Sequence, residues 1–135
     1  MHFDNIDELR DYYSHDEFAR ECLGARIDSY DFETHEAQVS MDVDGRHHNA
    51  LGSVMGGVMF SLADFALAVA CNTDQPGSCS VNHAINFMSA PRDEKLVACA
   101  RPDKLGRKLA FFTVDVHDGT GAKVARMTAT VFRLS

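Results

Sequence analysis

The residues from Val58 to Ala70 form the most apolar stretch of the chain, because all of them are apolar or small except Ser61 and Asp64. The stretch is too long for an ordinary strand and has no polar stripe. It therefore predicts a helix over Gly56–Asn72 that is buried on nearly all sides. A membrane span is the alternative, but crossing takes roughly 20 apolar residues, and this run is shorter and carries Asp64.

Segments with strand character lie on both sides of this helix. Residues 37–43 and 123–133 alternate apolar and polar side chains, the pattern of a strand with one buried face. Gly106 and the pair Asp118-Gly119 mark tight turns, and such short links favour antiparallel pairing. The expected strands are 25–32, 37–43, 79–87, 94–101, 109–117 and 123–133.

The first 24 residues predict two short helices. The patterns Asn5-x-x-Glu8 and Ser14-x-x-Glu17 are typical of helix N-termini, and Gly24 is a natural stop. We therefore expect one domain, with an N-terminal helical segment over 1–24 and a core over 25–135. In the core, a curved antiparallel sheet of five or six strands wraps the long helix. This α+β architecture is the hotdog fold.

Charge and cysteine content narrow the function classes. The net charge of -7 argues against generic binding to nucleic acids or anionic membranes. The opening MHFDNIDELR is acidic and amphipathic, which argues against a secretory signal. The four cysteines lack zinc-type spacing, and the only neighbouring histidines, His47 and His48, are poorly placed to share a metal ion. We therefore expect no metal and a cytoplasmic location.

Asp64 needs an explanation, because burying an unpaired carboxylate is costly. Two interpretations stay open: a structural pair that fixes packing, or a functional site. The pair Gly56-Gly57 favours the second. First-turn N–H groups have no intrahelical acceptor, the helix dipole makes that end electropositive, and glycine leaves room for an oxygen to approach. Such an end can polarise a carbonyl group and hold an oxyanion.

The spacing of these groups adds a constraint. Eight helical residues separate Gly56 from Asp64, which is about 12 Å along the axis. The two groups of one chain therefore cannot reach the same carbonyl group. They meet if two such helices pack antiparallel across a two-fold axis, so that Gly56 of one chain faces Asp64 of the other. A catalytic site would then imply a homodimer with two shared sites.

The stretch HHNALGSVMGGVMFSLADFALAVACN resembles the signature of the PaaI-like hotdog thioesterases, the phenylacetyl-CoA thioesterase group. The later segments SVNHAINFMSAP, KLGRKL and VHDGTGAKVARMTATVF are similar to later strands of that family. The resemblance covers residues 24–133. The positions that match the signature are His47, Asn49, Gly52, Gly56, Gly57, Leu62 and Asp64.

The resemblance implies hydrolysis of acyl-CoA thioesters without a metal or cofactor, since coenzyme A is part of the substrate. Asp64 would be the nucleophile or general base, and the Gly56 N–H would bind the thioester carbonyl. Asn49 would orient the substrate or a water molecule. Ser80 would assist near the carboxylate from the facing strand.

One position departs from the family, which usually has histidine where this chain has Met55. A thioether neither donates a hydrogen bond nor carries a proton. Met55 and Gly57 would still border the substrate, and His47 or His48 is a candidate replacement for the missing histidine. The alternative function is a non-catalytic acyl-CoA-binding hotdog protein. A third option, a hydroxyacyl dehydratase, usually pairs a histidine with an acid, and the sequence shows no such pair near this helix.

Coenzyme A carries several phosphate charges, so an acidic protein needs a local basic patch to bind it. Six of the thirteen basic residues lie between Arg92 and Lys108, against three acidic ones. The resemblance points to the same region for the nucleotide and pantetheine. The expected contacts are Ser89, Pro91, Arg92, Lys104, Gly106, Arg107 and Lys108.

The sequence gives broad expectations for the acyl group and for the assembly. Phe60, Phe65 and Phe87 are candidate lining residues of an acyl pocket, for a small aryl or medium-chain group. The expected partners are acyl-CoA and further copies of the chain, as a dimer or a dimer of dimers.

Overall fold

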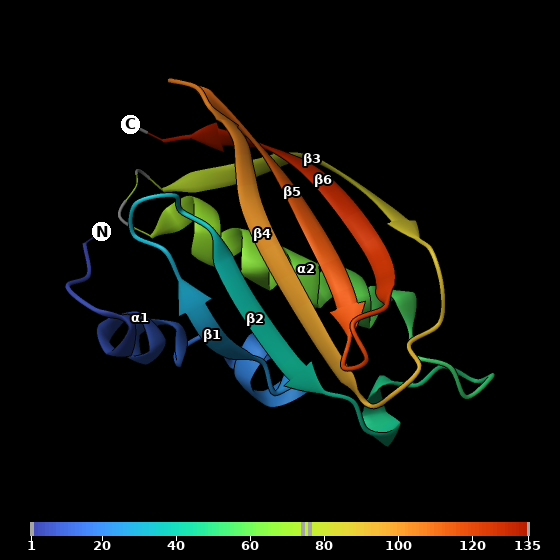
Figure 1. Ribbon diagram of the computed structural model, residues 1–135. Helices are drawn as coiled ribbons and strands as arrows, with labels where there is room; N and C mark the ends of the chain where they lie inside the picture. Colours follow the sequence, from blue (N-terminus) through green and yellow to red (C-terminus); the bar gives the residue numbers. More distant parts are fainter. Residues whose placement is uncertain (1, 74, 76, 135) are drawn as a thin grey trace.

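The computed structural model describes residues 2–73, 75 and 77–134, and Figure 1 shows their arrangement. Six strands form one antiparallel sheet in the order β1-β2-β4-β5-β6-β3, and the long helix α2 packs across it. The predicted hotdog architecture is confirmed, with six strands. The elements are α1 (Ile6–Tyr13), η1 (Phe18–Leu23), β1 (Arg26–Tyr30), β2 (Ala37–Asp42), η2 (Gly45–His47), α2 (Gly56–Asn72), β3 (Ser78–Phe87), β4 (Lys95–Leu105), β5 (Leu109–Asp118) and β6 (Lys123–Arg133).

Helix α2 begins and ends at the predicted residues and forms the centre of the core. Nine of its seventeen residues are buried, and small side chains such as Ala63 and Ala66 bring it close to the sheet. The facing side chains of β6 alternate as predicted and are all buried. They are Ala125, Met127, Ala129 and Val131. No helix within the described residues combines the length and the apolar character needed to cross a membrane.

Strand β4 is longer than predicted, since it continues to Leu105 rather than ending at residue 101. Pro102 has no N–H for the ladder, but it lies at a register shift between β4 and β5, and such a bulge absorbs the missing donor. The turn to β5 then consists of residues 106–108. A side chain at Gly106 would place its Cβ 2.5 Å from the carbonyl oxygen of Leu109, so this turn requires glycine.

The N-terminal segment forms two helices, as predicted, but one cap differs. Asn5 caps α1, and Gly24 ends η1 with a left-handed φ of 65°. The prediction that Ser14 begins the second helix is wrong, because Ser14 ends α1 instead. The carboxylate of Asp16 takes over the capping role and accepts the Ala19 N–H at 3.0 Å. The second helix, η1, is a π-helix.

Strand β3 forms one edge of the sheet and pairs with β6 alone (Figure 1). The opposite edge strand, β1, is contacted by α1. Several apolar side chains of β3 and its continuation are exposed, including Val81 at 60%, Phe87 at 51% and Met88 at 52%. A ten-residue edge strand with exposed apolar side chains offers free backbone groups to another strand, and native proteins cover such edges.

Candidate active site

Asp64 lies near the middle of α2, and its side chain lines a pocket of about 180 Å³ between α2 and η1. Its side chain is 51% exposed in the single chain. Burial raises the pKa of the carboxyl group, the nearby imidazole of His83 opposes this rise, and Asp16 adds to it. Phe60 and Phe65 line the same pocket. The carboxylate is therefore a stronger base than an ordinary aspartate and faces an apolar space.

His83 of β3 is the basic side chain beside this carboxylate. Its Nδ1 lies 3.6 Å from Oδ1 of Asp64, and its ring stacks on Phe60 with centroids 5.6 Å apart. The prediction that no histidine–acid pair lies near this helix is therefore wrong. His83 is opposite the buried Ala129 of β6, so it faces α2. In the segment SVNHAINF, every second residue (His83, Ile85 and Phe87) faces inward. This alternation is the sequence signal that could have indicated His83 as a site residue.

Ser80 faces the same side of the sheet as His83, because it is opposite the buried Val131. A bulge between Ser80 and Asn82 separates the two positions, and Ser80 itself is exposed. Among the described residues, Ser80 makes no hydrogen bond to Asp64. In this chain the neighbour of the carboxylate on β3 is His83, and the structure does not bring Ser80 to it.

The N-terminus of α2 is open, as predicted. Met55 is the N-cap residue, is 53% exposed and makes no side-chain capping bond. The ring of Phe87 covers one side of Gly56, where an added Cβ would lie 3.1 Å from Cζ. Phe87 therefore packs on the helix end rather than lining the Asp64 pocket. Since Gly56 and Asp64 belong to one continuous helix, they remain too far apart to share a carbonyl group.

Asn49 shapes the loop that leads into α2. Its Oδ1 accepts the N–H groups of Leu51 at 2.9 Å and Ser53 at 3.2 Å. The Asn49 Nδ2 makes no hydrogen bond to any described residue, so its donor remains free for a ligand. Gly52, with a φ of 80°, completes the turn.

His47 is held inside the protein and is unavailable as a replacement for the missing histidine. It is 3% exposed, its Nδ1 accepts the Asp44 N–H at 3.0 Å, and its Nε2 donates to the carbonyl oxygen of Cys22 at 2.8 Å. His48 is exposed and forms a β-bridge with Val54. Neither histidine lies beside Asp64.

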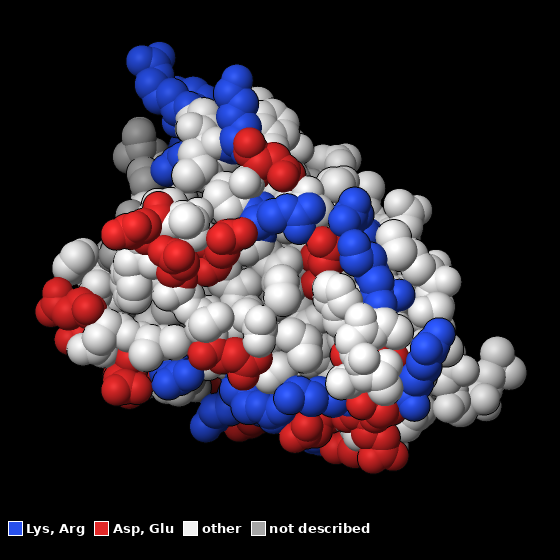
Figure 2. Space-filling view, in the orientation of Figure 1, with Lys and Arg blue, Asp and Glu red and all other residues white. Residues whose placement is uncertain are grey.

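The basic residues expected to bind coenzyme A lie at opposite ends of the sheet. The Arg92 N–H donates to Asp118 at 2.7 Å, beside the β5–β6 turn. The Lys104–Lys108 turn lies at the other end of β4, about 33 Å away for eleven extended residues. Within one chain, β4 therefore separates the two halves of the expected basic patch. In Figure 2, Lys and Arg gather over the β4–β5 turn, while the opposite end carries both signs of charge.

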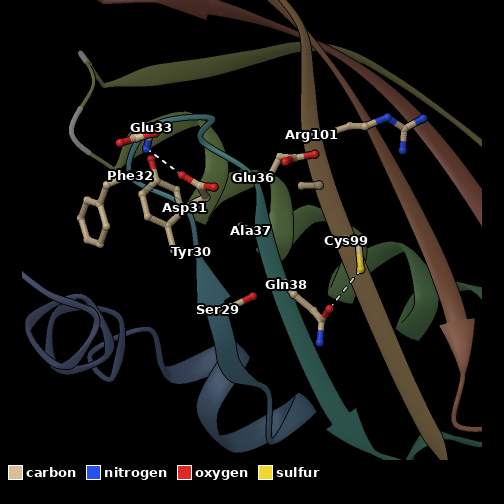
Figure 3. A pocket seen from close by; sticks show the side chains of 11 residues that line it. Ser29, Tyr30, Asp31, Phe32, Glu33, Glu36, Ala37, Gln38, Cys99 and Arg101 are labelled. Atoms are coloured by element: carbon tan, nitrogen blue, oxygen red, sulfur yellow. Dashed lines mark hydrogen bonds between the residues drawn. The ribbon is translucent and has the colours of Figure 1, made fainter.

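A larger hollow of about 740 Å³ lies on the open face of β1, β2 and β4 and is drawn in Figure 3. Asp31, Glu33 and Glu36 border it, and the guanidinium of its Arg101 is paired with Asp115 at 2.8 Å. Three carboxylates repel an anionic ligand such as a phosphate group. This hollow is therefore unsuited to coenzyme A.

No group of three or more His, Cys, Asp or Glu side chains within residues 2–73, 75 and 77–134 is placed to hold a metal ion. The chemistry available at the site is that of a carboxylate, an imidazole and backbone N–H groups. Those groups suffice for general-base hydrolysis of an activated ester.

The fold and this carboxylate site define a class, the hotdog-fold hydrolases that act on thioesters. Residues 51–125 match the thioesterase superfamily, and the chain belongs to that superfamily. The resemblance to PaaI-like thioesterases is confirmed by the structure of the E. coli PaaI protein from the phenylacetic acid degradation operon. It superposes with a TM-score of 0.87 at 27% identity, covering 96% of this chain and 93% of PaaI.

Two relatives are similar in sequence. A protein of Archaeoglobus fulgidus named "Putative esterase" is 33% identical over 131 residues, 96% of this chain and 84% of the relative. The human acyl-coenzyme A thioesterase 13 is 34% identical over 90 residues, which is 64% of each chain. These matches place the chain among thioester hydrolases.

Proposed function

We propose that the protein hydrolyses acyl-CoA thioesters as a homodimer, with Asp64 as general base or nucleophile and the Gly56 N–H of the other subunit as oxyanion donor. The observation that carries this proposal is the position of Asp64. It is the only carboxylate of an otherwise apolar helix, it opens onto an apolar pocket, and burial raises its pKa. The name of the human relative supports the substrate class.

The free edge of β3 supports the homodimer. If β3 pairs antiparallel with β3 of a second copy, Val81 and Phe87 become covered and the sheet continues across the interface. The two α2 helices then lie side by side and antiparallel. Gly56 meets Asp64 of the partner subunit, which one chain alone cannot achieve.

The same two-fold arrangement brings the two separated groups of basic residues close together. Within one chain, the Lys104–Lys108 turn lies near the C-terminal end of α2, and the segment 89–92 lies near its N-terminal end. Antiparallel helices bring the C-terminal end of one copy beside the N-terminal end of the other. The turn of one subunit then faces Ser89 and Arg92 of the other, which gives coenzyme A a basic groove between subunits.

Hydrolysis then follows from the groups present. The Asp64 carboxylate accepts a proton from water, and the hydroxide oxygen attacks the thioester carbonyl carbon. The Gly56 N–H stabilises the oxyanion that forms. The C–S bond breaks, the thiolate takes up the proton from Asp64, and the free acid leaves. If Asp64 attacks directly, the C–S bond breaks, the thiolate leaves and an acyl–carboxylate anhydride forms. Water then hydrolyses the anhydride, which releases the free acid, regenerates the Asp64 carboxylate and supplies the proton that the thiolate takes up.

The pocket supports a compact acyl group. About 180 Å³ lined by Phe60 and Phe65 suits a small aryl or medium-chain group. A dehydratase would need the histidine itself to touch the substrate. His83 is 10% exposed and its Nε2 is buried, so this pair does not support that function.

Thiol release from a panel of acyl-CoAs tests the proposal, with wild type, Asp64→Asn and Asp11→Asn compared at saturating substrate. Asp11 is an exposed aspartate of α1 that does not line this pocket, so Asp11→Asn is a matched control for the same chemical change. We expect wild type and the control to release thiol, and Asp64→Asn to lose about 10²–10⁴ in kcat. Binding of acyl-CoA without release, unchanged by Asp64→Asn, would instead identify a non-catalytic binding protein.

A further inference from the structure

His83 is enclosed between α2 and the sheet, in contact with Asp64 on one side and Phe60 on the other. Its side chain is 10% exposed, and Nδ1 lies 3.6 Å from the carboxylate oxygen of Asp64. The charged and titratable groups around this carboxylate come from three elements. They are His83 of β3, Asp16 before η1 and the Cys71 thiol further along α2. His83 is thus the only cation-forming group among them.

The other ring nitrogen has no partner. The Nε2 of His83 is buried and makes no hydrogen bond to any described residue. A buried polar group without a partner is unusual and calls for an explanation. The tautomer with its proton on Nδ1 directs the donor toward Asp64 and leaves Nε2 as an acceptor. Of the two ring nitrogens, Nδ1 therefore faces a polar neighbour, the Asp64 carboxylate, and Nε2 faces none among the described residues.

His83 favours the ionised form of Asp64, which is the form that the proposed reaction requires. Burial favours the neutral form of Asp64, and closing a partner subunit over the helix buries it further. A neutral carboxyl group cannot accept the proton of water. Met55 provides neither a hydrogen-bond donor nor a positive charge at the helix N-terminus, and His47 and His48 lie elsewhere.

We infer that His83 is the positioning residue of Asp64: its Nδ1–H orients the carboxylate and keeps it ionised, which supplies from β3 what Met55 lacks. This inference rests on the proposed thioesterase function. His83 acts through Asp64 and does not touch the substrate, because its exposed fraction is small and Nε2 is enclosed. The orientation of the Asp64 carboxylate by a donor and the electrostatic effect of the imidazole on it are separable. The test therefore uses variants that keep or remove the donor.

Three substitutions separate the two effects. His83→Asn places an amide nitrogen near the position of Nδ1, His83→Gln places one near Nε2, and His83→Leu removes both donors. All three remove the imidazole and its electrostatic effect on Asp64. We expect Asn to keep most of the wild-type kcat, while Gln and Leu lose up to about a hundredfold with KM little changed. His48→Leu, which removes an exposed histidine, is the control and should behave as wild type.

The pH profile supplies the readout that a merely structural role would not move. The imidazole of His83 lowers the pKa of Asp64, so removing the imidazole raises that pKa. The acid limb of kcat/KM should therefore move to higher pH in all three variants and stay in place in His48→Leu. Carboxyl ¹³C NMR of Asp64 should show the same upward shift without any turnover.

The outcomes distinguish the two hypotheses. If wild type releases no thiol, the proposed function fails, while the NMR titration still decides whether His83 tunes Asp64. If wild type is active and the Asp64 titration is the same in His83→Leu and His83→Asn as in wild type, His83 has no such role. Thermal unfolding of each variant confirms that a folded protein is compared.

Discussion

Gly56→Pro is the substitution that tests the oxyanion donor most directly. Gly56 is the first residue of α2, a position where proline is favoured and its missing N–H removes no helical hydrogen bond. The preceding residue, Met55, is extended with a ψ of 134°, which is the conformation that a residue before proline adopts. The substitution therefore deletes one N–H donor and leaves the helix able to form.

The expected loss is about 10²–10³ in kcat, or about 2.7–4 kcal/mol, the usual effect of removing one oxyanion donor. Crowding must be separated from this loss, because a Cβ at this position lies 3.1 Å from Cζ of Phe87 and the ring has to move by a few tenths of an ångström. Gly56→Ala creates the same Cβ contact and keeps the N–H. The ratio of kcat between the Ala and Pro variants therefore removes the effect of the Cβ contact and reports the replacement of the N–H by the proline ring.

The assay is steady-state thiol release with the acyl-CoA that wild type prefers, with thermal unfolding run on the same samples. We expect Gly56→Ala to stay within about tenfold of wild type and Gly56→Pro to fall a further hundredfold or more. Equal kcat values for the two variants, with both proteins folded, would refute the assignment of the Gly56 N–H as oxyanion donor.

One further prediction concerns the site shared between subunits. The other concerns Asp118, which accepts the Arg92 N–H from the segment that precedes β4. Mixing Gly56→Pro with Asp64→Asn subunits should restore activity, since each heterodimer holds one intact site; heterodimers as inactive as both parents would exclude a shared site. Hydrogen bonds, the strongest from the Thr120 hydroxyl, lower the pKa of Asp118 from 3.8 to about 2. This stabilisation is complete above the unfolded pKa and disappears as pH falls through about 2. Asp118→Asn should therefore melt below wild type at pH 7, and the difference should shrink between pH 4 and pH 2 in calorimetry.

The sequence predicts those parts of the fold that local periodicity determines. Helix α2 and strand β6 have the predicted bounds, because a long apolar run without a polar stripe and a two-residue alternation identify buried segments without tertiary information. The Ser14 cap was wrong for a local reason as well. Asp16 offers a carboxylate two residues further on, and a sequence pattern cannot rank the two side chains as caps.

The site was only partly predictable, because its composition depends on how β3 lies against α2. Asp64 and Gly56 stand out within one helix, whereas His83 is nineteen residues further along and reaches Asp64 only through the register of β3 with β6. Likewise, the basic residues are close in sequence, but the extended strand β4 carries them to opposite ends. Tertiary pairing decides both results, and no local pattern encodes it.

The placement of His83 changes what Met55 means for this chain. A histidine at residue 55 would stand at the helix N-terminus and would reach a carboxylate only across the interface between subunits. His83 lies beside Asp64 within its own chain, 3.6 Å away, so this contact exists before the subunits meet. The N-terminus of α2 then has a single task, to offer backbone N–H groups to the carbonyl oxygen. On this argument Met55 is compatible with catalysis, because β3 supplies an imidazole beside Asp64 and the N-terminus of α2 supplies the proposed oxyanion donor.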